Sequence, residues 1–171
     1  NRSMDFIKWF FHRKGLLFLF CILIWITVTS IHPTQYLIGW DNYSAYLGGV
    51  DGLFKTFFST WRSYRGIGVP GDSESADIFR QLIILALSPF VREPMRDQLY
   101  ILGCLWIGVL SIYALVSRLL SRIDKGRGFI DSIAAVSASV YLFNLNTLAT
   151  FYFPIITYIT RFAALPLLLL V

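Results

Sequence analysis

The chain contains four long apolar segments, and these limit the folds that it can adopt. The first segment, Gly15 to Ile31, contains no charged residue. Two more cover residues 99–120 and 129–143, and a fourth extends from about residue 157 to residue 171. A helix needs about 20 mostly apolar residues to cross a bilayer. The sequence therefore predicts four transmembrane helices, at about 15–31, 99–120, 129–143 and 157–171.

The composition supports a membrane protein. Hydrophobic residues make up 56% of the chain and charged residues 15%, whereas soluble domains carry about 25% charged residues. We expect an all-α, polytopic transmembrane fold. Because the chain ends inside an apolar run, Leu167 to Val171, we expect residues 1–171 to be the N-terminal part of a transmembrane domain in a longer protein.

Basic residues flank the apolar segments unevenly, which predicts an orientation. Two clusters of basic residues flank the predicted spans, and each contains a single acid. They are Arg2, Lys8, Arg13 and Lys14, with Asp5, and Arg118, Arg122, Lys125 and Arg127, with Asp124. The positive-inside rule places both clusters in the cytoplasm. The N-terminus is then cytoplasmic, and loop 32–97 lies outside the plasma (inner) membrane. The basic residues do not alternate with exposed aromatics, which argues against nucleic-acid binding.

The outer loop is too apolar to be a free linker. Aromatic and aliphatic residues recur at helical spacing from Tyr43 to Trp61, which predicts an amphipathic helix lying in the membrane interface. A glycine-rich loop from Tyr64 to Glu74 follows. A second short helix is expected from Ile78 to Leu87, ended by Ser88-Pro89.

Asp41 is the first candidate catalytic residue. It follows Trp40 just beyond the first predicted span. Partial desolvation at the bilayer edge would raise the pKa of this carboxyl and make it a better general base. Alternatively, Asp41 caps the interfacial helix, and the two roles are compatible.

Four arginines are candidates for binding a phosphate. Arg62, Arg65 and Arg80 lie in the outer loop, and arginine suits bidentate phosphate contacts. Contact with lipid headgroups is the alternative. Arg161 lies at the outer end of the fourth span, where an ionisable residue indicates function if it faces protein or water. Its alternative is snorkelling to headgroups.

Metal-site signals are weak. Asp72 and Glu74 could offer oxygen ligands to a divalent cation such as Mg²⁺ or Mn²⁺, although a solvated loop is the simpler explanation of these acids. Asp131 is expected to be a helix-start acid favoured by the helix dipole. Cys21 and Cys104 lie in apolar runs and are expected to be packing residues.

Several stretches together resemble a known family. They are Phe57-Phe58-Ser59-Thr60-Trp61, Arg65-Gly66-Ile67-Gly68, Ser75 to Arg80, Leu87-Ser88-Pro89-Phe90, Ala138 to Asn146, and Phe162 to Leu167. With an acid in the first outer loop, this pattern resembles the start of a GT-C type integral-membrane glycosyltransferase. It is most similar to the YfhO-like proteins and the AftD-type arabinofuranosyltransferases of cell-wall biosynthesis.

The resemblance implies an activity and a set of site residues. Such enzymes transfer a sugar from a polyprenyl-phosphate donor to a glycan or lipid acceptor outside the membrane. The family's first-loop catalytic acid would fall on Asp41, and Arg161 and Arg65 would meet the donor phosphate. The chain lacks the paired-acid motif DxD or DE in this loop. The alternative is a non-enzymatic membrane scaffold, or a transporter subunit for lipid-linked sugars, that uses the same helices to hold lipid.

Overall fold

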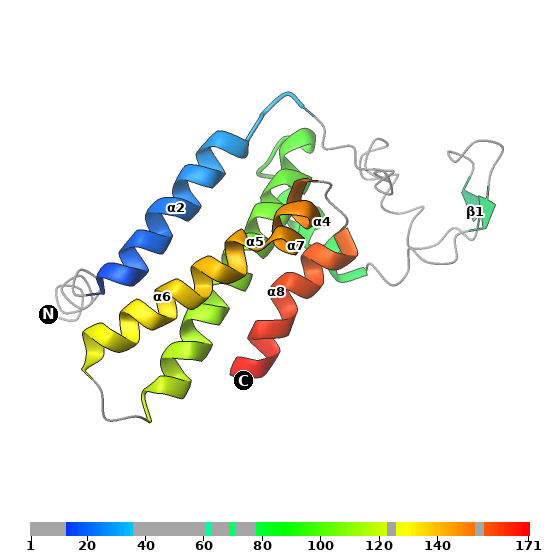
Figure 1. Ribbon diagram of the computed structural model, residues 1–171. Helices are drawn as coiled ribbons and strands as arrows, with labels where there is room; N and C mark the ends of the chain where they lie inside the picture. The colour runs from blue at the N-terminus through cyan, green and yellow to red at the C-terminus, as the bar shows by residue number, and fades with distance from the viewer. Residues whose placement is uncertain (1–12, 36–60, 63–68, 71–77, 123–125, 153–155) are drawn as a thin grey trace, which may run out of the picture. The chain divides into compact units, whose positions relative to one another are not determined.

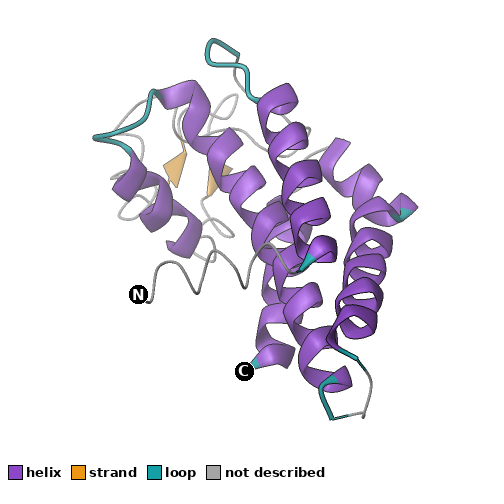
Figure 2. Cartoon of the chain, turned by 90° about the vertical axis from the view of Figure 1, so that its left-hand side faces the viewer, coloured by secondary structure: helices purple, strands orange, loops and turns teal. Residues whose placement is uncertain are grey.

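The computed structural model describes residues 13–35, 61–62, 69–70, 78–122, 126–152 and 156–171. Nearly all of this part of the chain is helical (Figures 1 and 2). The helices are α2 (Lys14–Ser30), α4 (Ile78–Leu87), α5 (Glu93–Leu120), α6 (Arg127–Phe143), α7 (Leu145–Tyr152) and α8 (Ile156–Leu170). The expectation of an all-α protein is confirmed for the described residues, apart from one short strand pair.

That strand pair lies in the predicted outer loop. Strand β1 (Trp61–Arg62) pairs antiparallel with β2 (Val69–Pro70), and Trp61 lies opposite Pro70. The prediction that Trp61 ends an interfacial helix is therefore wrong, because backbone pairing with residues across the glycine-rich turn replaces helical hydrogen bonds there. The rest of that predicted helix, from residue 43 to 60, lies outside the described residues.

The chain forms two compact units. One comprises residues 1–31 and 101–171, and the other comprises residues 32–100. The boundary falls within α5. We call them the bundle unit and the loop unit.

The helices of the bundle unit alternate in direction. The backbone N–H of Gly15, at the start of α2, contacts Asp131 near the start of α6, so these helices run the same way. Tyr113, late in α5, also contacts Asp131, which makes α5 antiparallel to both. Arg118 contacts the Leu170 carbonyl, so α8 ends beside the end of α5. These directions are those that the predicted topology requires, while the position of a membrane stays a prediction.

A contiguous apolar core holds these helices together. It includes Leu19 and Leu23 of α2, Val109 of α5, Ala138 of α6 and Phe162 of α8. Leu19, Leu23 and Ala138 are completely inaccessible to solvent. Trp106 packs its ring edge-on against Phe20 at 5.4 Å, and its indole N–H donates to Thr27 Oγ1 at 2.9 Å.

Only α5 is by itself long and apolar enough to cross a membrane, among the residues the structure describes. Helices α6 and α7 meet the same criterion as a pair, bent by 50°. Helices α2 and α8 are apolar but shorter. A protein with one candidate membrane span is therefore shown, and the four-span arrangement belongs to the proposal below.

The bend between α6 and α7 was not predicted from the sequence, and Asn144 accounts for it. The Thr147 N–H donates to Asn144 Oδ1 at 2.9 Å, which is the bond of a helix N-cap. Asn144 Nδ2 donates to the Tyr141 carbonyl at 2.7 Å. One side chain thus ends α6 and starts α7.

The cysteines fit the packing prediction only in part. Cys104 is buried in α5, whereas Cys21 is exposed on α2, and neither forms a disulfide. Cys21 lies on the outward face of its helix, where packing against other helices of the bundle unit is not available to it.

Candidate functional site

Most of the predicted site residues lie outside the described residues. These are Asp41, Arg65, Asp72 and Glu74, and for Arg62 the structure describes only the backbone, in β1. Their roles stay predictions. The described candidates are Arg80, in the loop unit, and Arg161, in the bundle unit, and each is described within its own unit.

Arg80 is held by an acid. Its Nη1 lies 3.7 Å from Asp97 Oδ1, and both side chains are largely buried, with 11% and 17% of their surface exposed. The pair joins α4 to the first turns of α5. A guanidinium held in this way has part of its charge neutralised, so any phosphate it meets would share it with Asp97.

The turn between α4 and α5 is fixed by a second arginine that the sequence analysis did not single out. Arg96 Nε donates to the Val91 carbonyl at 3.0 Å, and Nη2 donates to the Ser88 carbonyl at 3.1 Å. The side chain thereby satisfies carbonyls exposed where α4 ends. These two hydrogen bonds fix the turn between α4 and α5.

Gln98 anchors the chain segment that leads toward Asp41. It is buried, with 3% of its surface exposed. Its Nε2 donates to the carbonyls of His32, at 2.9 Å, and Gln35, at 2.7 Å. Its Oε1 accepts the His32 N–H at 2.8 Å. No local pattern in the sequence marks Gln98, because its partners lie more than sixty positions earlier.

We expect Gln98→Ala to release this anchor. Three hydrogen bonds to backbone are lost, at about 1 kcal/mol each, so the amides of His32, Thr34 and Gln35 should exchange with solvent at least tenfold faster. Hydrogen exchange read by mass spectrometry measures this. Gln98→Glu is the matched control, since it keeps the acceptor and removes both donors, and it should give an intermediate rate. Unchanged exchange in Gln98→Ala would contradict the anchor.

Arg161 is exposed on α8. Its guanidinium carbon lies 5.7 Å from the centre of the Tyr158 ring, one turn earlier on the same helix. A cation over a ring face gains about 0.5–1 kcal/mol at an exposed site, which holds the side chain against its helix. At 1.5 Å per residue, Arg161 is about 13 Å along the axis from Leu170. It therefore lies away from the basic end of the bundle unit.

Asp131, at the basic end, is a buried acid whose two carboxylate oxygens both accept hydrogen bonds. It is 7% exposed. Its Oδ2 accepts the Gly15 N–H at 2.7 Å, and its Oδ1 accepts the Tyr113 hydroxyl at 2.5 Å. Arg13 Nη1 in turn donates to the Tyr113 hydroxyl at 3.2 Å.

The prediction that Asp131 is a helix-start acid of its own helix is therefore wrong. Helix α6 begins at Arg127, which puts Asp131 in the second turn. The carboxylate caps α2 instead, because Gly15 carries one of the orphan N–H groups of the first turn of α2. Asp131 acts on a helix more than a hundred residues earlier in the chain.

Within the described ranges, no group of three or more His, Cys, Asp or Glu residues is arranged to hold a metal ion. The weak metal candidates, Asp72 and Glu74, lie outside those ranges. No protein-family model, curated protein or solved structure matches this chain.

Proposed function

We propose that this chain is the N-terminal part of a GT-C type integral-membrane glycosyltransferase of the cell envelope. Its four apolar helical segments would form a polytopic domain in the plasma (inner) membrane, with the N-terminus cytoplasmic and the active site extracytoplasmic. The enzyme would move a sugar from a polyprenyl-phosphate donor to a glycan or lipid acceptor. Residues 1–171 would form the first part of the transmembrane domain.

The exposed position of Arg161 on α8 is the observation that carries the proposal. It is the only charged residue after Asp131, and it is exposed on an otherwise apolar helix away from the basic end of the bundle unit. An ionisable side chain in such a helix is costly and indicates a polar ligand. A lipid-linked phosphate arriving from the outer leaflet is such a ligand.

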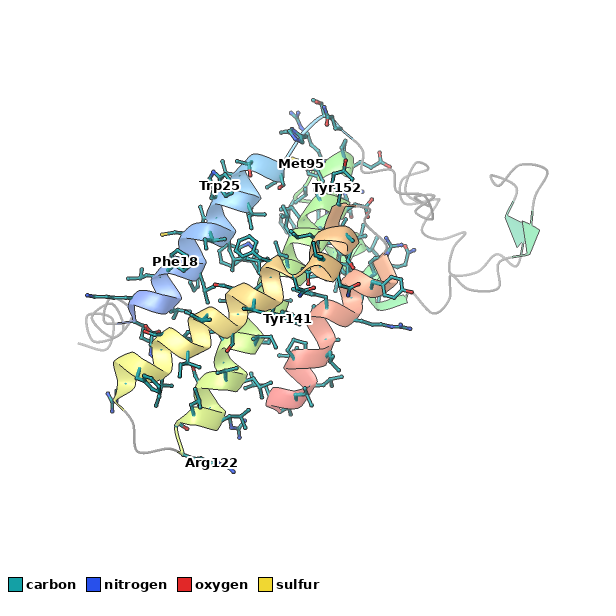
Figure 3. The ribbon with its side chains drawn as sticks, viewed as in Figure 1. Phe18, Trp25, Met95, Arg122, Tyr141 and Tyr152 are labelled. Carbon is teal, nitrogen blue, oxygen red and sulfur yellow. The ribbon has the colours of Figure 1, made fainter. Side chains whose placement is uncertain are left out.

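Exposed apolar side chains support the membrane setting. Trp25 and Val28 of α2 are 68% and 71% exposed, and Leu168 of α8 is 73% exposed. Figure 3 shows where Trp25 lies on α2. Surfaces of this kind are costly in water and favourable in lipid.

In the proposed reaction, Asp41 takes the proton of the acceptor hydroxyl as its oxygen attacks the anomeric carbon. The bond from that carbon to the phosphate oxygen breaks, and polyprenyl phosphate leaves with the electron pair. Arg161, with an outer-loop arginine such as Arg65, neutralises the phosphate as its charge grows. A single direct displacement inverts the anomeric carbon. A divalent cation on Asp72 and Glu74 would assist the same leaving group.

Asp41→Asn is the test. The variant should lower sugar transfer by about 10²–10⁴-fold, the usual contribution of a general base, with normal membrane insertion. Transfer is measured in membranes carrying the full-length protein, from a radiolabelled polyprenyl-phosphate sugar. Asp51→Asn, a second acid of the same loop, is the matched control and should keep full activity. Arg161→Gln should raise the KM for the donor.

A different result would favour the alternative. If wild-type protein binds the donor but transfers nothing to any acceptor, the chain is a scaffold or transporter subunit. If Asp41→Asn transfers as fast as wild type, Asp41 is only a helix cap and the catalytic assignment is lost.

A further inference from the structure

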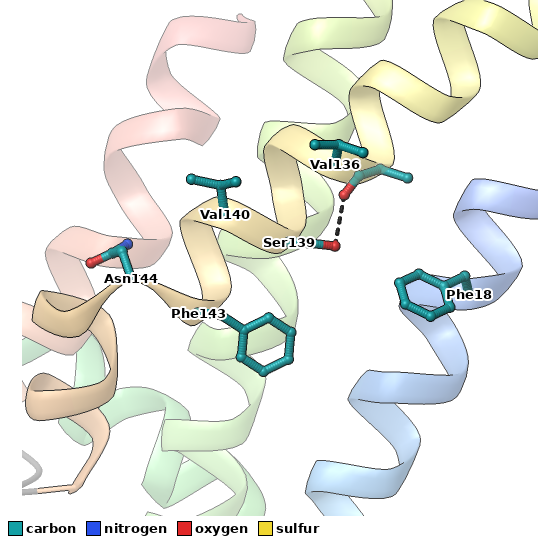
Figure 4. A pocket seen from close by; sticks show the side chains of 7 residues that line it. Phe18, Val136, Ser139, Val140, Phe143 and Asn144 are labelled. Carbon is teal, nitrogen blue, oxygen red and sulfur yellow. Dashed lines mark hydrogen bonds between the residues drawn. The ribbon is translucent and has the colours of Figure 1, made fainter.

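An open groove lies between α2 and α6 in the bundle unit (Figure 4). Its volume is about 540 Å³. The rings of Phe18 and Phe143 point into the space between the two helices. The lining residues are Phe18, Ala135, Val136, Ser139, Val140, Phe143 and Asn144.

The two polar residues of this lining are already bonded within the protein. The Ser139 hydroxyl donates to the Ala135 carbonyl at 2.8 Å. The Asn144 amide nitrogen donates to the Tyr141 carbonyl and to Thr147 Oγ1, and its oxygen accepts the Thr147 N–H. A polar ligand in the groove would lose its hydrogen bonds to water and gain few in return. The groove therefore suits a hydrocarbon chain.

One end of the groove is cationic. Lys14 and Arg127 are exposed at the first residues of α2 and α6, and the Gly15–Asp131 bond holds these two helix starts together. Neither side chain is paired with an acid among the described residues. Asp131 already caps the N-terminus of α2, and the N-terminus of α6 adds partial positive charge at this end. Phe18 lies one turn beyond Lys14, so the cationic end leads directly into the apolar groove.

We propose that this groove binds one anionic phospholipid of the cytoplasmic leaflet. An acyl chain lies between α2 and α6, and the headgroup phosphate meets Lys14 and Arg127. Basic pockets between transmembrane helices at the cytoplasmic face are sites of this kind. The site is separate from the proposed donor site, because Arg161 lies away from the basic end, and it does not depend on sugar transfer.

Charge variants test the headgroup contact. The full-length protein is purified in detergent containing equal amounts of phosphatidylglycerol and phosphatidylcholine, and bound lipid is counted by native mass spectrometry. We expect one phosphatidylglycerol per chain. Lys14→Gln and Arg127→Gln should each weaken its retention about fivefold, and the double variant roughly 25-fold, with no effect on phosphatidylcholine.

Arg122→Gln is the matched control for these variants. Arg122 is exposed near the end of α5, outside the groove (Figure 3), and its removal changes the net charge equally. Lipid retention is measured at about 0.5 M salt, where the Debye length is only about 4 Å. Because a charge outside the groove is then screened from the bound headgroup, Arg122→Gln should retain phosphatidylglycerol as wild type does. If Arg122→Gln and Lys14→Gln lose the same amount of bound phosphatidylglycerol, the proposed headgroup site is wrong.

A groove-filling variant tests the acyl chain. Val140→Trp places a large ring in the groove and should abolish retention of the lipid, whereas Leu168→Trp, at an exposed position of α8, should not. Both positions are exposed, at 65% and 73%, so folding is preserved and is checked by gel filtration. Undiminished lipid binding in Val140→Trp, the absence of any retained lipid in wild type, or a second copy of the chain cross-linked through Val140 would each overturn the proposal.

Discussion

Asp131→Ala is expected to lower the free energy of unfolding by about 3–5 kcal/mol, the usual cost of removing one partner from a buried charged network. The Gly15 N–H and the Tyr113 hydroxyl both lose their acceptor. Neither finds another, because the site is buried and a helix start cannot reach a different carbonyl. The transition is measured by titrating detergent-solubilised protein with sodium dodecyl sulfate.

Three further variants separate the parts of this effect. Asp131→Asn keeps one acceptor oxygen and should cost about half as much. Tyr113→Phe removes one hydroxyl and should cost about 1–3 kcal/mol. Ser132→Ala is the matched control, since Ser132 is exposed and, among the residues that the structure describes, bonds only to the Gly128 carbonyl of its own helix. If Asp131→Ala and Ser132→Ala unfold at the same concentration of sodium dodecyl sulfate, Asp131 does not cap α2.

The second large effect is expected for Gly108→Ala. A Cβ atom at Gly108 would overlap a ring carbon of Phe162 and lie 2.9 Å from its carbonyl oxygen. The ring cannot swing away freely, because it stacks on Tyr141 at 4.4 Å and meets Phe151 edge-on at 5.2 Å. The Phe162 carbonyl is also fixed, since it accepts the Tyr141 hydroxyl at 2.9 Å. Overpacking of this kind costs about 1–3 kcal/mol or more.

Gly103→Ala provides the control on the same helix. A Cβ at Gly103 meets no atom within 4 Å, and alanine favours a helix over glycine by about 0.8–1 kcal/mol. We therefore expect Gly103→Ala to stabilise the protein slightly and Gly108→Ala to destabilise it, in the same titration. If the two variants have the same free energy of unfolding, α5 and α8 do not approach closely at Gly108.

Helix positions were largely predictable because local signals set them. The segment from Ile78 to Leu87 ends at Ser88-Pro89 as expected. The second predicted span begins at residue 99, six residues later than α5 does. The prediction followed the apolar run, whereas the helix also includes a polar first turn with Pro94, which is tolerated in the first turn of a helix. The third ends at Phe143 as predicted. Helix α7 was missed, although Asn144, a good N-cap residue inside an apolar run, was the available signal.

Contacts between distant segments were not predictable from local patterns. Asp131 looks like an acid at the start of its own helix, and only the packing of α2 beside α6 makes it the cap of α2. Gln98 is unremarkable in sequence for the same reason. Of the candidate site, Arg80 and Arg161 lie on helices as expected, and the roles of Asp41 and the other outer-loop residues stay predictions.

The bond between Gly15 and Asp131 has a consequence for biosynthesis. Its two residues are 116 positions apart. A ribosome adding about 5–20 residues per second needs on the order of ten seconds to travel that distance. Helix α2 therefore leaves the ribosome and enters its environment long before its own cap is made. During that interval its first turn is completed by water or by lipid headgroups, and the emergence of α6 is the event that locks it in place.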